Sequence, residues 1–387
     1  MEHNKLIFSK VPTLRFAEYT DEWHIYALSD FVTRITRRNK NNESSLPLTI
    51  SAQYGLVDQI TFFNKTVASV DLSGYYLLYN GDFAYNKSYS NDYAWGAVKR
   101  LDKYEKGCLS SLYFVFRPTD KVDSDYLTHY FETNKWHKGI SDIAGEGARN
   151  HGLLNMAVDD YFATKHYLPS LSEQKKIACF LNLITKRIEI QNKIISKYET
   201  LIKGIRERVV SGSWQWKKLD ELIQEGVVRL NRGNIIPKHQ KDNTYKYPVY
   251  SSSTQNNGLM GYNNTYMFDK ELITWSIDGG GNFFYRKKHK FNVTNVCGIM
   301  QVDENVYSYR FIAEMLTYQH SKMKFDYQSK AHPSVISSLY SLPCLPILEQ
   351  NSYCQLFVAL DRKMQIEQYG LNKLKEQKKY LLSKMFI

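Results

Sequence analysis

Two short stretches, LPSLSEQ at residues 168–174 and LPILEQ at residues 345–350, decide the fold of this chain. Each places Leu-Pro a few residues before Glu-Gln, and each precedes a long charged segment with regularly spaced apolar residues. Upstream of each copy stands a tryptophan, Trp23 before the first and Trp216 before the second. A plan written twice in this order indicates a tandem duplication whose copies have diverged.

The segments after Glu-Gln carry the heptad pattern of a coiled coil, because apolar positions recur at alternating spacings of four and three residues. The expected seam positions in the first segment are Ile177, Leu181, Ile184, Ile188, Gln191, Ile195, Tyr198, Ile202, Ile205 and Val209. Those in the second are Tyr353, Phe357, Leu360, Met364, Glu367, Leu371, Leu374, Lys378, Leu381 and Met385. The fifth position is polar in both copies, which either fixes register and partner or is merely tolerated.

We therefore expect four segments: a first globular domain at 1–170, a long helix at 171–213, a second globular domain at 214–346 and a second long helix at 347–387. Gly212 is expected to end the first helix. Each helix would be about 50 Å long at about 1.5 Å per residue. An antiparallel pairing of the two helices is the most economical arrangement, with the globular domains at opposite ends.

The globular domains alternate short runs of Tyr, Phe, Val and Leu with turn residues. Strands are expected in the runs at 75–79, 112–116, 272–275 and 296–302, and helical stretches near 125–138 and 308–323. The predicted fold class is α+β: two α+β domains separated by two long antiparallel coiled-coil helices, as a pseudo-twofold tandem repeat.

The 387 residues carry 51 Lys and Arg against 39 Asp and Glu, a net charge of +12. Such an excess favours a nucleic-acid partner, because neutralising phosphates releases counterions; the alternative is an ordinary basic protein. Residues 15–170 hold 17 basic and 19 acidic side chains, whereas residues 214–346 hold 16 and 11. The first domain would therefore need a local basic patch to bind DNA.

Motifs that would carry catalysis are missing from the sequence. It contains no P-loop, no G-x-G-x-x-G motif and no H-E-x-x-H motif. No two prolines are adjacent, which excludes the Asp/Asn-Pro-Pro-aromatic loop that is typical of adenine-N6 methyltransferases. The five cysteines are dispersed without a C-x-x-C pair, which argues against a zinc site or a disulfide framework. We expect no catalytic residue, no bound metal and no bound cofactor.

No apolar run approaches 18 residues, and the first ten residues lack the apolar core of a secretory signal. The expected location is the cytoplasm, with no membrane partner.

Across essentially its whole length the chain resembles the DNA-specificity subunit of type I restriction-modification systems. The residues that carry the resemblance are Pro12-Thr13-Leu14-Arg15-Phe16 leading into Trp23, Gly81 to Asn86, Gly107 with Ser110 to Tyr113, the first Leu-Pro with Glu173 to Ile177, and in the second copy Trp216, Tyr247 to Ser252 and Glu349-Gln350. In two respects the second copy departs: Glu349 follows its Leu-Pro one residue sooner, and Asn351-Ser352 replaces Lys175-Lys176. These departures blur where the second helix starts.

The resemblance implies that each globular domain is a target-recognition domain for one half of a bipartite double-stranded DNA sequence. It implies that the helices fix the gap and dock two modification (methyltransferase) subunits, and that restriction (motor-nuclease) subunits join the complex. Those partners would carry S-adenosylmethionine, ATP and magnesium.

Candidate DNA-binding residues are basic or amide side chains in polar turns, since Arg can grip guanine bidentately and Lys more often holds phosphate. In the first domain they are Arg34, Arg37, Arg38, Lys40, Asn86, Lys87 and Arg149; in the second, Arg229, Arg232, Ser252, Thr254, Asn256, Arg286, Lys287 and Lys330. Ordinary solvated loops are the alternative, and Arg286-Lys287-Lys288 could equally be the exposed tip of a hairpin. On the helices, Lys186, Arg187, Arg206 and Arg208 could meet phosphates or acidic partners, or form a solvated face.

Two other functions stay open: a stand-alone sequence-specific DNA-binding regulator that dimerises through its coiled coil, and a nucleic-acid enzyme with an unfamiliar motif. Neither the target sequence nor the spacer length can be read from the residues.

Overall fold

The computed structural model describes residues 10–65, 68–69, 71–89, 93–145, 152–236, 246–253, 255–323 and 330–387. The chain divides into two compact units, one formed by Met1–Gln191 with Gly370–Ile387 and the other by Asn192–Tyr369. Both long helices are therefore shared between the units. The division into four segments expected from the sequence stays a prediction.

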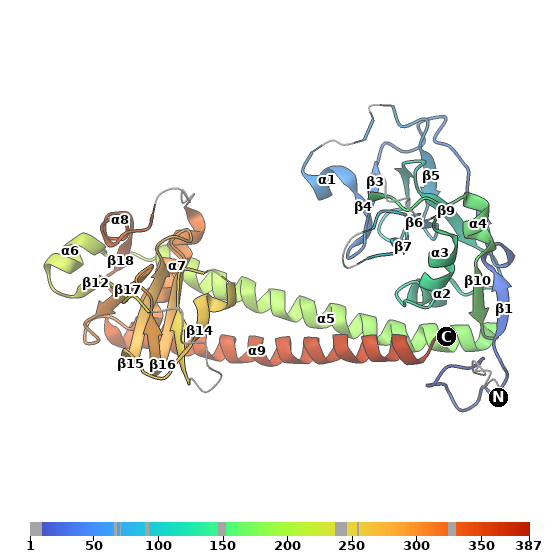
Figure 1. Cartoon of the computed structure of the whole chain (residues 1–387). Helices are drawn as coiled ribbons and strands as arrows, with labels where there is room; N and C mark the ends of the chain where they lie inside the picture. Colours follow the sequence, from blue (N-terminus) through green and yellow to red (C-terminus); the bar gives the residue numbers. More distant parts are fainter. Residues whose placement is uncertain are drawn as a thin grey trace. The chain divides into compact units, whose positions relative to one another are not determined.

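The first unit contains a four-stranded antiparallel sheet in the order β2-β9-β6-β7, of which β6, β7 and β9 are labelled in Figure 1. Its strands are β2 (Val32–Arg34), β9 (Phe114–Pro118), β6 (Phe83–Asn86) and β7 (Ala97–Arg100). Three two-stranded sheets accompany it: β1 (His24–Ala27) with β10 (Lys165–Leu168), β3 (Leu48–Ser51) with β4 (Gly55–Asp58), and β5 (Tyr76–Tyr79) with β8 (Lys106–Leu109).

In the described part of the first domain the α-helices are short: α1 (Gln59–Phe63), α2 (Ser124–Tyr130), α3 (His137–Ile143) and α4 (Val158–Ala163). A 3-10 helix, η1 (Leu28–Asp30), follows β1. Aromatic rings fill the core between the α-helices and the sheet. Tyr85 on β6 stacks on Tyr161 of α4 with ring centroids 4.8 Å apart, and Trp23 packs edge-on against Tyr126. This burial explains why so many aromatic residues occur in the strand runs.

The helical stretch expected near 125–138 is two helices. Asp123 caps α2, since its Oδ1 accepts a hydrogen bond from the Tyr126 backbone N–H at 2.9 Å. After α2 ends at Tyr130, the Thr133 hydroxyl donates to the Tyr130 carbonyl at 2.6 Å. This hydroxyl provides the partner that a continued helix would have supplied, and the chain turns before α3.

The second unit is built on a six-stranded sheet in the order β12-β17-β15-β16-β13-β14. The strands are β12 (Val228–Arg232), β17 (Cys297–Val302), β15 (Phe268–Ser276), β16 (Phe283–Val293), β13 (Tyr247–Tyr250) and β14 (Leu259–Asn263). A further pair joins β11 (Trp216–Lys218) to β18 (Ser341–Pro343), as β1 joins β10 in the first unit. Its helices are α6 (Leu219–Gln224), α7 (Tyr309–Lys322) and α8 (Pro333–Leu339).

The long helices are α5 (Leu171–Val210) and α9 (Ile347–Lys384). α5 ends just before Gly212, where a Cβ would collide with the Trp214 indole. All twenty expected seam positions are buried or half-buried. In the first unit Ile177 and Leu181 of α5 share one core with Leu381 and Met385 of α9.

In the second unit Ile202 of α5 packs with Phe357 and Leu360 of α9. The start of α5 thus meets the end of α9 in one unit, and the end of α5 meets the start of α9 in the other. This pairing is antiparallel, and the predicted fold class is confirmed. None of the described helices is long and apolar enough to span a membrane.

Candidate nucleic-acid interface

A basic cluster in the first unit is organised around the buried carboxylate of Asp82, in the turn before β6. This carboxylate accepts hydrogen bonds from Arg37 Nη2 at 3.0 Å, Arg117 Nε at 2.6 Å and the Tyr79 backbone N–H at 2.8 Å. The side chains of Arg37 and Arg117 remain 37% and 45% exposed. Two guanidinium groups therefore share one counter-charge, which leaves a net positive, fixed surface.

Arg37 and the adjacent Arg38 also lie over tyrosine rings. The Arg37 guanidinium lies 4.2 Å from the ring centre of Tyr79, and that of Arg38 lies 4.4 Å from Tyr76. Arg38 Nη1 also donates to the Gly74 carbonyl at 2.5 Å. Planar, immobilised guanidinium groups are suited to paired contacts with phosphate or guanine.

The following loop presents Lys40. Buried Asn39 closes it, accepting from the Ser44 backbone N–H at 3.1 Å and donating to the Ser44 carbonyl at 2.9 Å. Lys40 and Arg34, at the end of β2, are exposed. Of the four basic residues expected here from the sequence, Arg37 shares Asp82 with Arg117, and Arg38 follows it directly. Arg34 pairs with Phe116 and therefore faces the other side of the sheet from Arg117, and Lys40 is joined to the cluster by no contact among the described residues.

Asn86 and Lys87 lie at the other end of β6 from Asp82. The Asn86 side chain accepts from the Ser88 backbone N–H at 2.9 Å, and the Lys87 ammonium lies 4.7 Å from the ring centre of Phe114. Burial lowers the pKa of Lys87. These two residues therefore form a place separate from the Asp82 cluster, and Arg149 lies outside the described residues.

In the second unit several candidates gather at one end of the six-stranded sheet. The Ser276 hydroxyl, at the end of β15, donates to the Ser252 carbonyl at 2.5 Å. Lys330 pairs with Asp278 at 3.4 Å, two residues beyond that strand. A Cβ on Gly279 would stand 2.3 Å from the Ser252 carbonyl oxygen, so only glycine lets these turns approach so closely.

Arg232 joins this end from β12, where its guanidinium donates to Nδ1 of His332, the residue that precedes α8. It borders a groove of about 440 Å³ lined also by Asn231, Asn234 and Gln301. Asn256 is exposed in the neighbouring turn, with a left-handed φ of 49°. Thr254 lies outside the described residues.

Arg286 is not at a hairpin tip. It lies inside β16, paired with Leu272 of β15, and is only 4% exposed. Its guanidinium stacks 3.6 Å from the ring centre of Tyr250 and its Nε donates to Thr274 Oγ1 at 2.9 Å. Burial lowers its pKa to about 10. Its neighbour Lys287 is exposed, because successive strand residues face opposite sides.

Lys287 lies within β16 and Arg229 within β12, away from the sheet end where Arg232, Ser252 and Lys330 gather. Arg229 is exposed and pairs with Gln301 of β17. Sequence reasoning missed Arg117, Asp82 and His332. Arg117 could have been flagged as an arginine at the end of a strand run, but the other two gain their roles only through distant partners.

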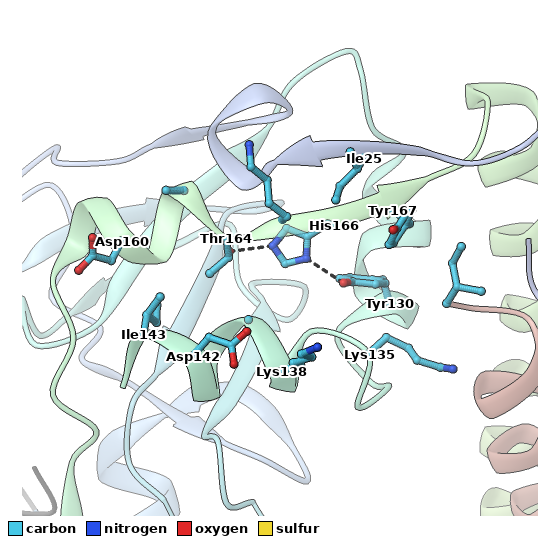
Figure 2. A pocket seen from close by; sticks show the side chains of 14 residues that line it. Ile25, Tyr130, Lys135, Lys138, Asp142, Ile143, Asp160, Thr164, His166 and Tyr167 are labelled. Atoms are coloured by element: carbon cyan, nitrogen blue, oxygen red, sulfur yellow. Dashed lines mark hydrogen bonds between the residues drawn. The ribbon is translucent and has the colours of Figure 1, made fainter. Parts of the chain in front are cut away.

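A pocket of about 480 Å³ in the first unit lies between β10, α3 and α4 (Figure 2). The charged residues that line it are Lys135, Lys138, Asp142, Asp160 and Lys165. Its central imidazole, His166, is bonded at Nδ1 to the Tyr130 hydroxyl and at Nε2 to the Thr164 hydroxyl, both at 2.8 Å (Figure 2).

Burial lowers the pKa of His166 to about 4, so the ring is neutral near pH 7. Because both ring nitrogens are occupied, His166 is not placed to move protons for a ligand. Among the residues that the structure describes, no group of three His, Cys, Asp or Glu side chains could hold a metal ion.

Comparison with known proteins matches residues 212–376 to the family described as the type I restriction modification DNA specificity domain. A candidate type I specificity subunit of Mycoplasma pneumoniae is 39% identical over 100 residues, which are 25% of this chain and 32% of that protein. Another is 27% identical over 192 residues, 47% of this chain and 77% of that one. The MpnII specificity subunit of the same organism is 29% identical over 128 residues, 32% of this chain and 39% of that subunit.

The chain thus spans about a third of the length of the first of these relatives. Among solved structures, the type I restriction-modification S subunit from M. genitalium has a TM-score of 0.62 at 16% identity, covering 97% of this chain and 99% of that one. A structure from work on complex assembly and conformational transition of the type I system has a TM-score of 0.54 at 15% identity, covering 94% and 97%. These two structures show the same fold.

Proposed function

We propose that this chain is a type I restriction-modification specificity subunit, as its match to the specificity-domain family over residues 212–376 supports, and that each unit reads one half of a bipartite DNA target. The observation that carries the proposal is the Asp82 cluster. There Arg37 and Arg117 are fixed by one buried acid yet keep a third or more of their side chains exposed. Residues 15–170 carry no positive excess overall, so a local patch of this kind is what the first domain needs to hold DNA.

In the second unit the corresponding place is the sheet end that carries Arg232, Ser252 and Lys330. Two separate basic sites on duplicated domains fit a target with two halves. The paired helices α5 and α9 would set the distance between the half-sites.

The helices would also dock two modification subunits, with restriction subunits joining the complex. Apolar side chains stand exposed on α5, among them Leu183 at 59% and Ile190 at 47%. Seven-residue spacing puts these two on one outer stripe, away from the buried seam. S-adenosylmethionine, ATP and magnesium would act on the partner subunits, and this chain would supply recognition without catalysis.

The test is to map methylated adenines across the genome with and without the gene for this chain. Loss of one bipartite motif is expected, and the lost motif identifies the target. In reconstitution, methylation of that target should require both this chain and the modification subunit. Methyl transfer by the isolated chain would contradict the proposal.

A stand-alone regulator that dimerises through its coil is the second candidate. The seam residues Leu181 and Phe357 are buried within the chain's own units, which leaves the seam unavailable to a second copy. Light scattering separates the candidates. A dimer whose mass does not change when the modification subunit is added would favour the regulator.

A further inference from the structure

The duplicated Glu-Gln motif holds a glutamine that makes the same two contacts in both copies. Buried Gln174 accepts through Oε1 from the backbone N–H of Asp123, the residue that caps α2, at 2.8 Å. Its Nε2 donates to the carbonyl of Pro169, five residues earlier, at 3.0 Å. One side chain therefore joins the start of α2 to the chain that enters α5.

Gln350 repeats this arrangement in the second unit. Its Oε1 accepts from the backbone N–H of Ser308, the residue that precedes α7, at 3.0 Å. Its Nε2 donates to the carbonyls of Leu345, again five residues earlier, and Val306, both at 2.8 Å. Both glutamines are at least 98% buried. In both copies the glutamine contacts the carbonyl five residues before it, which belongs to Pro169 in the first copy and to Leu345 in the second. The contact therefore depends on the distance from the glutamine, and it survives although the second Leu-Pro stands one residue closer to Glu-Gln.

The preceding glutamate does not behave alike in the two copies. Glu173 is buried and pairs with Arg15 through two contacts of 2.7 Å, whereas Glu349 is exposed. Only the glutamine is therefore common to the two junctions. A glutamate in its place could accept but not donate, so the amide is the group that this double contact requires.

The helix that each glutamine holds is tied a second time to both long helices. In the first unit, Asn182 of α5 donates to Asp125 of α2 at 2.8 Å, and Lys378 of α9 pairs with Glu132, just beyond α2, at 2.8 Å. Burial raises the pKa of Glu132, but the hydrogen bond from His129 and the nearby charge of Lys378 together lower it to about 2.

In the second unit the same ties run through α7. Glu314 accepts from Arg206 of α5 at 2.6 Å, and Arg310 donates to Asp361 of α9 at 2.8 Å. Each domain helix is thus joined to the helix that follows its domain and to the one that arrives from the other domain.

We propose that Gln174 and Gln350 are positioning residues that fix the angle of each recognition domain on the helix pair, and so set which spacing between half-sites is accepted. This rests on the proposed function, because spacing matters only for a bipartite target. A domain free to tilt at this junction would carry its basic cluster along the DNA, where one base pair corresponds to about 3.4 Å.

The test uses this chain in complex with its modification subunit, on duplexes carrying the mapped target with its native spacer or with one base pair added or removed. Gln174→Met and Gln350→Met keep the side-chain length and remove the two polar contacts of Gln174 and the three of Gln350. Glu349→Gln, next to Gln350 and exposed, is the matched control. The ratio of methylation rates on native and altered spacers measures spacing selectivity, and binding to a duplex with one half-site measures base reading.

We expect each Met variant to lower the spacing ratio at least about threefold, because a single lost hydrogen bond is already worth about that much, with half-site binding unchanged. Should a Met variant fail to fold, Gln350→Glu keeps the contact to Ser308 and should show an intermediate ratio. Folded variants with the wild-type ratio would overturn the inference. A wild-type complex indifferent to spacing would instead overturn the proposed function, and the inference with it.

Discussion

The Asp82 carboxylate lies 2.6 Å from Arg117 Nε across the sheet of the first unit, and the same carboxylate also orients Arg37. Asp82 is fully buried, whereas both arginines reach solvent. The acid therefore acts as an internal anchor for a positive surface.

Replacing Asp82 with Asn removes the counter-charge and turns one of the two acceptor oxygens that Arg37 and Arg117 use into an NH2 donor. We expect a loss of about 2 kcal/mol in the free energy of unfolding, typical of hydrogen bonds to a charged group, together with weaker binding of the half-site that the first domain reads. Urea denaturation and half-site binding measure the two effects. Asp120→Asn, at an exposed acid, should change neither quantity. A half-site affinity unchanged in Asp82→Asn would show that the cluster does not meet DNA.

Arg34 and Lys40 are exposed and, unlike Arg37 and Arg117, do not pair with buried Asp82. Substituting them should therefore change DNA binding without changing the stability of the fold. Arg34→Gln or Lys40→Gln should leave thermal stability unchanged. Each should lower the slope of log binding constant against log salt concentration by about 1 if the side chain neutralises one phosphate. Lys165→Gln, on the separate β1-β10 sheet, is the control and should leave the slope as it is. If all three variants keep the wild-type slope, the phosphate contacts lie elsewhere on the protein.

The elements read best from the sequence were those with a local signal. The coiled-coil seam follows from spacings of three and four residues, and α7, at Tyr309–Lys322, nearly coincides with the stretch expected at 308–323. Roles that depend on partners distant in the sequence were not accessible. Arg117 and Asp82 stand 35 residues apart, and Arg286 owes its burial to the ring of Tyr250 on another strand. The repeated glutamine was visible as a motif, but its double contact was not.

The buried imidazole of His166 should make the first unit sensitive to acid. Its pKa falls from 6.5 in the unfolded chain to about 4 in the fold because of burial, so the unfolded chain binds more protons between these values. The free energy of unfolding should therefore decrease as the pH falls from about 6.5 to about 4, by up to about 3 kcal/mol. Urea denaturation at pH 7, 6 and 5 measures the slope.

His166→Phe should flatten that slope, whereas His24→Gln, at an exposed histidine, should leave it unchanged. Glu132, whose folded pKa is about 2, loses its contribution at lower pH, as the pH falls from 4.5 toward 2. The two groups are therefore separable by the pH window. A slope above pH 5 that persists in His166→Phe would assign the acid sensitivity to another group.

Gly233 lies directly after Arg232, where β12 passes close to the end of β16. A Cβ at this position would stand 2.1 Å from the Val293 carbonyl oxygen and 2.4 Å from that of Thr294, and both contacts are with backbone that cannot move aside cheaply. Gly233→Ala should therefore lower the free energy of unfolding of the second unit by about 2 kcal/mol or more and displace Arg232 from the groove that it borders. Gly261→Ala, where a Cβ meets nothing within 4 Å, is the matched control and should cost well under half as much. Thermal unfolding of both variants and binding of the second half-site are the measurements. Equal stability of the two variants would mean that β12 and β16 are farther apart in solution. Unchanged half-site binding by a destabilised Gly233→Ala variant would show that Arg232 is not part of the DNA interface.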